Sequence, residues 1–169
     1  MMRRSQNGLT LAELLTTCAL LAVLLGLALP AVSRWIGRQQ LQGALDDVAA
    51  ALSLARKTAI SAQRPVWVTA SEQPDQSWRI RVSYLRNHSD CLPERDVRCL
   101  SGGEHAGTRL RLNGSPGELQ FSPLHGLPYD ADGRLLKGLE WRLERDGCQP
   151  AELRLLPTGL IHAAEAACP

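Results

Sequence analysis

The chain has 169 residues, about the length of a single domain. Its 19 Lys and Arg are nearly balanced by 17 Asp and Glu, and the formal net charge of +2 argues against a chain-wide nucleic-acid footprint or a disordered acidic tail. Hydrophobic residues make up 44% and charged residues 21% of the chain, as in a globular protein rather than a disordered one.

The apolar residues gather near the N-terminus. From Leu14 to Val32 no side chain is charged, a run of 19 residues. At about 1.5 Å per residue, a helix of this length spans about 28 Å, close to the roughly 30 Å hydrocarbon core of a membrane. We therefore expect a membrane anchor followed by a soluble part of roughly 135 residues.

Five cysteines divide into Cys18, within the apolar run, and four beyond it. An even number after an export segment suggests two disulfides in an oxidising compartment. Four cysteines allow three connectivities, and pairing Cys91 with Cys99 and Cys148 with Cys168 is favoured because each bond closes a local, turn-rich segment. The spacing is not that of a zinc site.

The first residues resemble an ordinary secretory signal only in part. Arg3 and Arg4 supply a basic start and Ala31–Ser33 passes for a cleavage site, so a secreted β protein beginning at Arg34 stays open as an alternative. Against it, the apolar run is too long for a signal core, and Glu13 stands at its beginning. A carboxylate near the membrane interior costs about 2.5–3.5 kcal/mol on insertion scales and normally has a partner.

The position of Glu13 fits a more specific pattern. A short basic leader, residues 1–8, ends in Gly8, and Leu9 follows it. Glu13 is then the fifth residue after the leader, and Pro30 is the twenty-second. This arrangement resembles the class III signal of type IV prepilins and type II secretion pseudopilins, with Leu at the first mature position where that family usually has Phe. The resemblance implies that the prepilin peptidase cuts after Gly8 and methylates the new amino group of Leu9.

The same resemblance implies roles in assembly. In the filament of this family, the Glu13 carboxylate would neutralise the N-terminal amine of a neighbouring subunit and so fix axial register. The alternative is an isolated interfacial carboxylate tolerated near a helix end. Pro30 removes one helical hydrogen bond and should kink or loosen the helix. Arg3 and Arg4 would hold the leader in the cytoplasm, which leaves the chain beyond Val32 in the periplasm.

Beyond Val32 the pattern becomes amphipathic. An apolar stripe with helical spacing comprises Leu41, Leu45, Val48, Leu52, Ala55 and Ala59, and the residues off the stripe are Asp46, Asp47, Arg56 and Lys57. We predict one helix from about Leu9 to Ser61, ended by Pro65, with its outer half packed on a sheet. The expected divisions are a leader over 1–8, a transmembrane helix over 9–32, the periplasmic half of the helix over 33–63 and a β-rich domain over 64–169.

The remaining chain predicts short strands separated by turns. The candidates are Val66–Ala70, Trp78–Leu85, Thr108–Leu112, Glu118–Ser122, Leu139–Glu144, Glu152–Leu156 and a short Leu160–Ala163. Alternation should turn Ile80, Val82, Leu110 and Leu112 toward the helix and the arginines between them toward water. Segments 87–107 and 126–138 are predicted to be loops. The layout is an α+β pilin-like fold, a long N-terminal helix packed on an antiparallel β domain.

Motifs in the C-terminal half of the sequence narrow this resemblance to one group within the family. Phe121 at the end of a strand, Gly126 after it, and Pro157-Thr158-Gly159 after a later strand resemble the GspH/FimT group of minor pilins and pseudopilins. Residues 9–17 look slightly closer to the FimT-like side. The implied function is a structural subunit of a type IV pilus or of its priming or tip complex, and the alternative is a GspH-type pseudopilin of type II secretion. The implied partners are other pilins or pseudopilins, the prepilin peptidase and the inner membrane.

A further alternative is DNA binding for uptake in natural transformation. Some FimT-like pilins bind DNA through a Gly-Arg-x-Arg element, but here Gly159 is followed by Leu160, Ile161 and His162. In place of that element, four other arginines could form a basic patch if their strands are adjacent, namely Arg79, Arg81, Arg109 and Arg111. Such a patch would contact phosphates without reading the DNA sequence. A solvated sheet face is the plainer interpretation, and the net charge beyond Val32 is only +1. DNA is therefore the less favoured partner.

Enzymatic functions have less support. The histidines show no metal-ligand spacing; they are His88, His105, His125 and His162. The sequence has no nucleophile elbow, phosphate loop or dinucleotide fingerprint. Asp130 and Asp132 before Gly133 resemble part of a calcium loop, although such a sequence is more often a turn. We expect no catalytic residue, no metal and no cofactor.

Overall fold

The computed structural model describes residues 11–73, 77–86, 91–92 and 94–168, apart from the side chains of 27–31. Gly8, Leu9 and the side chain of Pro30 therefore lie outside the described residues. The chain divides into two compact units, Met1–Ile36 and Gly37–Pro169, and helix α1 (Leu11–Ala62) contributes to both. The expected boundaries at residues 8, 32 and 63 stay predictions.

In the first unit, α1 is continuous through residue 30. The hydroxyl groups of Thr16 and Thr17 donate to the backbone carbonyl of Glu13, over 3.0 and 2.9 Å, so their polar groups are satisfied within the helix. No stretch of helix within the described residues combines the length and hydropathy that a membrane crossing requires. The kink expected at Pro30 stays a prediction.

In the second unit, the C-terminal half of α1 buries the predicted stripe. All six stripe residues, from Leu41 to Ala59, are fully buried, and Ala44 and Ala51 are buried with them. This burial confirms the predicted stripe. Its spacing of four and three residues keeps these side chains on one helix face. The helix ends at Ala62, one residue after the predicted end, and Pro65 follows.

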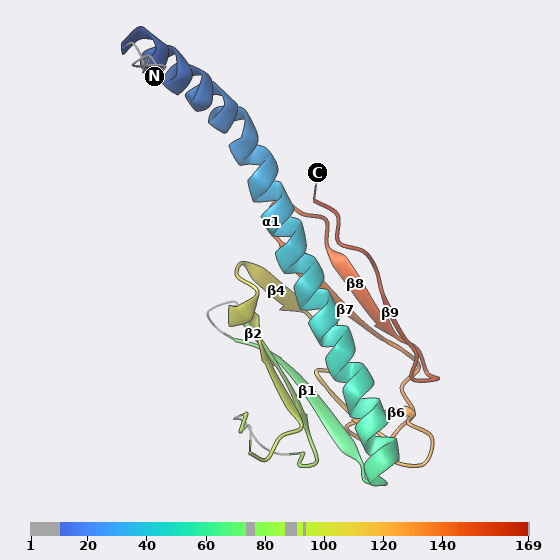
Figure 1. Ribbon diagram of the computed structural model, residues 1–169. Coiled ribbons are helices and arrows are strands. Elements are labelled where there is room, and N and C mark those ends of the chain that lie inside the picture. Colours follow the sequence, from blue (N-terminus) through green and yellow to red (C-terminus); the bar gives the residue numbers. More distant parts are fainter. Residues whose placement is uncertain (1–10, 74–76, 87–90, 93, 169) are drawn as a thin grey trace, which may run out of the picture. The chain divides into compact units, whose positions relative to one another are not determined.

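Two antiparallel sheets complete the second unit, and α1 lies across them in Figure 1. Sheet A has the order β3 (Arg98–Ser101), β2 (Trp78–Ser83), β1 (Val66–Glu72), β5 (Glu118–Phe121) and β6 (Pro128–Asp130). Sheet B has the order β4 (Thr108–Arg111), β7 (Leu139–Arg145), β8 (Ala151–Leu155) and β9 (Ile161–Ala163). The α+β pilin-like architecture expected from the sequence is confirmed.

Large aromatic side chains fill the core of the second unit. Trp78 from sheet A, Trp141 from sheet B and Phe121 are almost completely buried. The indole N–H of Trp78 donates to the hydroxyl of Thr108 over 3.1 Å, which joins the two sheets through a buried hydrogen bond. Burying aromatic side chains against α1 supplies a large part of the apolar contact that holds helix and sheets together.

The structure corrects the predicted loops. Strand β3 and a short 3-10 helix, Gly102–Glu104, lie within the segment 87–107, and β6 lies within 126–138. Both strands are edge strands of three or four residues. Such short segments bury too few side chains to show a recognisable alternation, and each forms because a neighbouring strand supplies hydrogen bonds.

Two disulfides tie irregular segments to the second unit. Cys91 bonds to Cys99 in β3, and Cys148 bonds to Cys168 in the C-terminal tail, which is the pairing favoured from the sequence. Cys18 is free and exposed. The tail is held further by the amide N–H of Ala166, which donates to the side chain of Gln42 on α1 over 2.9 Å.

Replacing both Cys91 and Cys99 by serine is expected to lower the free energy of unfolding by about 2 kcal/mol, because the bond restricts the unfolded chain. Urea unfolding followed by tryptophan fluorescence measures the change. Wild-type protein unfolded with a reductant present is the control, since it loses both disulfides and should be at least as unstable as the variant. An unchanged unfolding midpoint in the variant would contradict the prediction.

Candidate functional site

The first unit exposes apolar side chains around α1. All of the following are more than half exposed: Leu11, Leu14, Leu15, Leu20, Leu21, Val23, Leu24 and Leu25. Glu13 is the one charged residue in the described stretch 11–26. A helix that is hydrophobic on every face is normally buried in a larger assembly or in lipid. This segment is therefore the first candidate interaction surface.

The four arginines expected to form a basic patch lie on two different sheets. Arg79 and Arg81 belong to β2 of sheet A, whereas Arg109 and Arg111 belong to β4 of sheet B. Strand β2 pairs with β1 and β3, and β4 pairs with β7. The two strands are therefore not neighbours in a sheet, and contact of these four arginines with DNA stays a prediction.

Arg81 also departs from the prediction that it faces water. Only 4% of the residue is exposed. Its guanidinium donates to the backbone carbonyl of Arg86 over 2.9 Å and to the hydroxyl of Thr69 over 3.5 Å. The segment that follows β2 covers this side chain, so Arg81 is a structural residue and does not face a ligand.

The arginines of β4 have carboxylate partners. Arg109 pairs with Asp146 at 2.5 Å, and Arg111 lies 3.3 Å from Glu72 and 3.6 Å from Glu144. The hydrogen bond from Arg109, and then its charge, hold the pKa of Asp146 below its usual value. The same pairing raises the pKa of Arg109. A phosphate group would have to displace these carboxylates to bind here.

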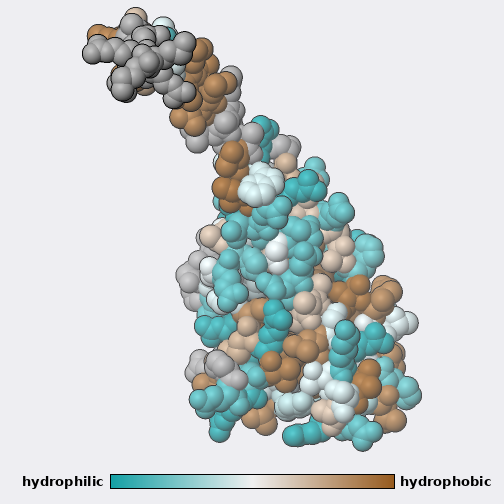
Figure 2. All heavy atoms as spheres, viewed as in Figure 1, coloured by the Kyte–Doolittle hydropathy of each residue, from teal (hydrophilic) through white to brown (hydrophobic). Residues whose placement is uncertain are grey.

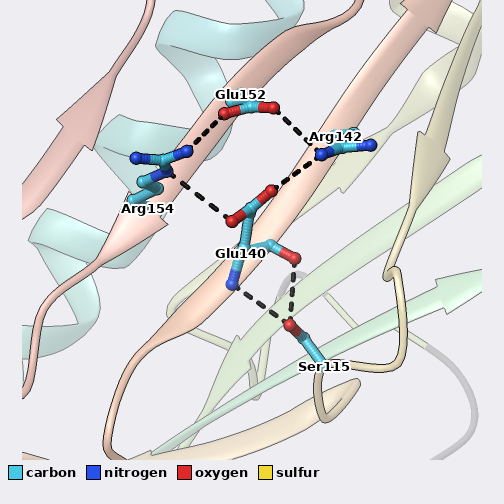
Figure 3. Close-up of polar contacts among 5 residues, drawn as sticks. All are labelled: Ser115, Glu140, Arg142, Glu152 and Arg154. Carbon is cyan, nitrogen blue, oxygen red and sulfur yellow. Dashed lines mark hydrogen bonds and ion pairs between the residues drawn. The ribbon is translucent and has the colours of Figure 1, made fainter.

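The outer face of sheet B carries a square of alternating charges, drawn in Figure 3. Arg142 lies 3.1 Å from both Glu140 and Glu152, and Arg154 lies 3.6 Å from Glu140 and 2.8 Å from Glu152. The hydroxyl of Ser115 donates to the carbonyl of Glu140 and accepts from its N–H. Two positive and two negative charges cancel, so this face has no net attraction for an anion.

Asp47 connects α1 to the edge of sheet A, a role that was not predicted from the sequence. Its carboxylate accepts a hydrogen bond from Arg98 of β3 over 3.0 Å and contacts Nε2 of His105 over 2.9 Å. The His105 ring stacks on Trp78, with ring centroids 6.2 Å apart. Asp47 thus holds α1 to the edge of sheet A through residues more than fifty positions away.

Replacing Asp47 by asparagine is expected to destabilise the second unit by about 1 kcal/mol, because two charged or polar donors lose a carboxylate in a partly exposed site. Asp46→Asn is the matched control: Asp46 is exposed and, among the described residues, accepts a hydrogen bond from the Gln42 side chain alone, so its loss should cost no more than about 0.5 kcal/mol. Urea unfolding compares the two, and equal effects would mean that the Asp47 contacts contribute nothing specific.

The C-terminal motif residues meet on α1. A Cβ built on Gly126 would lie 2.9 Å from Cγ of Arg56, and one on Gly159 would lie 3.0 Å from Nε of Arg56. The turns after β5 and β8 therefore pack directly on one helix side chain. These two glycines were singled out by the sequence motif, but their common partner Arg56 was not.

The remaining candidates are structural. Oδ1 of Asp130 accepts from the amide N–H groups of Asp132 and Arg134, over 2.9 and 2.8 Å, as in an ordinary turn. Within the described residues, one group has ligand atoms close enough for a metal, namely Cys91, Asp96 and Cys99. Its two sulfurs are bonded to each other, so they offer no thiolate.

Comparisons with known proteins agree on one family. The family described as "Type II transport protein GspH" matches residues 44–159, and the "Prokaryotic N-terminal methylation motif" matches residues 3–29. No curated protein sequence matches the chain.

Two crystal structures of the type IV minor pilin FimU from Pseudomonas aeruginosa are similar in fold. For the P65 crystal form the TM-score is 0.52 at 17% identity, covering 73% of this chain and 91% of that one. For the P21 form the TM-score is 0.55 at 19% identity, covering 75% and 89%.

The family match spans more than half of the chain, and the methylation motif is typical of prepilins that are anchored in the inner membrane. Members of such families are processed by a prepilin peptidase and assemble with other pilins as structural subunits without enzymatic activity. The chain therefore belongs to the GspH family and is a minor pilin or pseudopilin of a type IV pilus or a type II secretion system.

Proposed function

We propose that this protein is a FimT-like minor pilin that is built into a type IV pilus or into the complex that primes or caps it. The first unit supports this proposal most strongly: an apolar, exposed helix carries Glu13 as its one acid over the described residues 11–26. Apolar surface of this extent is stable in water only when it is covered. A membrane covers it before assembly, and the helices of neighbouring subunits cover it afterwards.

Assembly then depends on three N-terminal residues. The prepilin peptidase cuts after Gly8 and methylates Leu9, which leaves a charged amine at the start of the mature helix. Glu13 of one subunit neutralises that amine on the next, so both charges leave water as a pair. Because an unpaired charge in apolar surroundings is costly, this pairing allows one axial register between subunits.

The type IV pilus is preferred over type II secretion on two grounds. Residues 9–17 look closer to FimT-like proteins, and the FimU structures that share the fold are of a type IV minor pilin. The second unit makes lateral contacts in the filament and carries no catalytic machinery in this proposal. DNA uptake is not retained as a second function, because the four arginines are split between sheets and three of them have partners.

Deletion of the gene in its own bacterium tests the proposal. We expect fewer surface pili, measured in the sheared fraction, and reduced twitching, with secretion of type II substrates unchanged. Restoring the wild-type gene should recover both properties. Normal pili together with a loss of type II secretion would contradict the proposal and identify the protein as a pseudopilin.

A further inference from the structure

A groove runs between α1 and the turn that leads into β9, entirely within the second unit. Its volume is about 270 Å³. The helix wall consists of Ser53, Arg56, Lys57 and Ile60, and the opposite wall consists of Gly159, Leu160 and Ile161. The helix residues have the i, i+3, i+4, i+7 spacing of one helix face. In Figure 2, hydrophobic surface gathers in the lower part of this unit, where α1 ends in Figure 1.

The groove carries positive charge that the described residues leave unbalanced. Neither Arg56 nor Lys57 forms an ion pair with a carboxylate of the described part of the chain, and no residue lining the groove is acidic. Nε of Arg56 is buried and has no hydrogen-bond partner there. Buried polar groups are normally hydrogen-bonded, so this N–H is an unsatisfied donor beside the groove.

The fold holds the Arg56 side chain in place from two sides. The turns at Gly126 and Gly159 approach its Cγ and Nε so closely that either glycine with a Cβ would press against it. A side chain that is already restrained loses little conformational entropy when it binds. Arg56 is therefore preorganised to receive a planar anionic group such as a carboxylate.

The rims of the groove are aliphatic. Ile60 is 42% exposed and Leu160 is 58% exposed, so both are accessible beside the two cations. A free inorganic anion would not use these side chains. A peptide segment with a carboxylate next to aliphatic side chains would use both the charge and the apolar rims.

We propose that this groove binds an acidic, aliphatic peptide segment of a neighbouring pilin subunit, with its carboxylate on Arg56 and Lys57. The proposed function enters only in naming another subunit as the source of the segment. Duplex DNA fits less well, because it binds through many phosphate contacts over a wide basic surface, whereas this groove offers two cations between aliphatic side chains.

The test uses the full chain in detergent micelles and a short fluorescein-labelled, C-terminally amidated peptide with one glutamate between two leucines. Fluorescence anisotropy should show saturable binding. Replacing the glutamate by glutamine, or both leucines by glycine, should each weaken binding about tenfold or more. Equal binding of the three peptides would overturn the proposal.

Variants locate the site. Arg56→Gln and Lys57→Gln should each weaken binding about tenfold, whereas Lys137→Gln, an exposed lysine outside the groove, should leave it unchanged. Lys57 is itself exposed, so its replacement is informative even if Arg56→Gln disturbs the fold. If Lys137→Gln weakened peptide binding as much as the two groove variants, the assignment of the peptide to this groove would be overturned.

Two competitors distinguish other ligands. Inorganic phosphate that displaces the peptide completely at equal concentration would mean a simple anion site, and salt-sensitive duplex binding lost with Lys57→Gln would mean a nucleic-acid site; either result overturns the peptide proposal. Glu13→Val should bind the peptide normally. Loss of peptide binding by the groove can therefore be distinguished from loss of filament assembly.

Discussion

Replacing Glu13 by valine is expected to remove the protein from sheared filaments while leaving cleavage after Gly8 intact. Without the carboxylate, the methylated amine of the neighbouring subunit enters apolar surroundings unpaired, which costs about 3–5 kcal/mol, or more than a hundredfold in an assembly equilibrium. The valine keeps α1 apolar, so the precursor should still be anchored. Immunoblots of the sheared and membrane fractions measure the distribution.

Thr16→Val is the matched control for this prediction. Thr16 lies one helical turn from Glu13, and its hydroxyl donates to the backbone carbonyl of Glu13 in the same helix, so its loss should leave incorporation nearly unchanged. Glu13→Asp should recover part of the incorporation, because the charge remains on a shorter side chain. Normal incorporation of Glu13→Val would show that the pairing of carboxylate and amine does not govern assembly.

The second large effect is expected at Gly159. Replacement by alanine should lower the free energy of unfolding by about 3 kcal/mol. Its φ of +78° is a conformation that residues with a Cβ rarely adopt, and a Cβ here would lie 2.6 Å from the backbone carbonyl oxygen of Gly126. The clash is with backbone, which cannot rotate away as a side chain can.

Gly133→Ala separates the strain of a positive φ from the steric clash with the Gly126 carbonyl oxygen. Gly133 has nearly the same φ, +79°, but a Cβ there would meet nothing within 4 Å. Its replacement should cost only the conformational strain, about 1 kcal/mol. Urea unfolding of both variants, followed by tryptophan fluorescence, gives the difference. If the two variants are equally unstable, the close packing of the Gly126 and Gly159 turns has no energetic weight.

The elements that could be predicted from sequence are those with a long or regular pattern. The helical stripe from Leu41 to Ala59 repeats over five turns, and only one helix face can bury it. Strands β1, β2 and β7 are six or seven residues long and show alternation or contain bulky apolar residues. Strands β3 and β6 could not be predicted, because a segment of three or four residues becomes a strand through its neighbour.

The candidate site was less accessible, because its partners are distant in sequence. Alternation correctly placed Arg79 and Arg109 between buried residues, but it carried no information about which strands lie side by side. The sheet order separates β2 from β4, and only a three-dimensional structure shows this. Arg56 is similar: it was recognised as lying off the apolar stripe, but the two turns that enclose it come about seventy and one hundred residues later.

The lengths of the outermost strands have a consequence for the subunit before it is assembled. Both sheets end in strands of three or four residues, β3 and β6 in sheet A and β4 and β9 in sheet B. A long open edge offers a row of free N–H and carbonyl groups to any other strand, and many copies stored close together would then aggregate. Edges this short offer few such groups, so unassembled subunits at high local concentration can remain folded and monomeric until they are assembled.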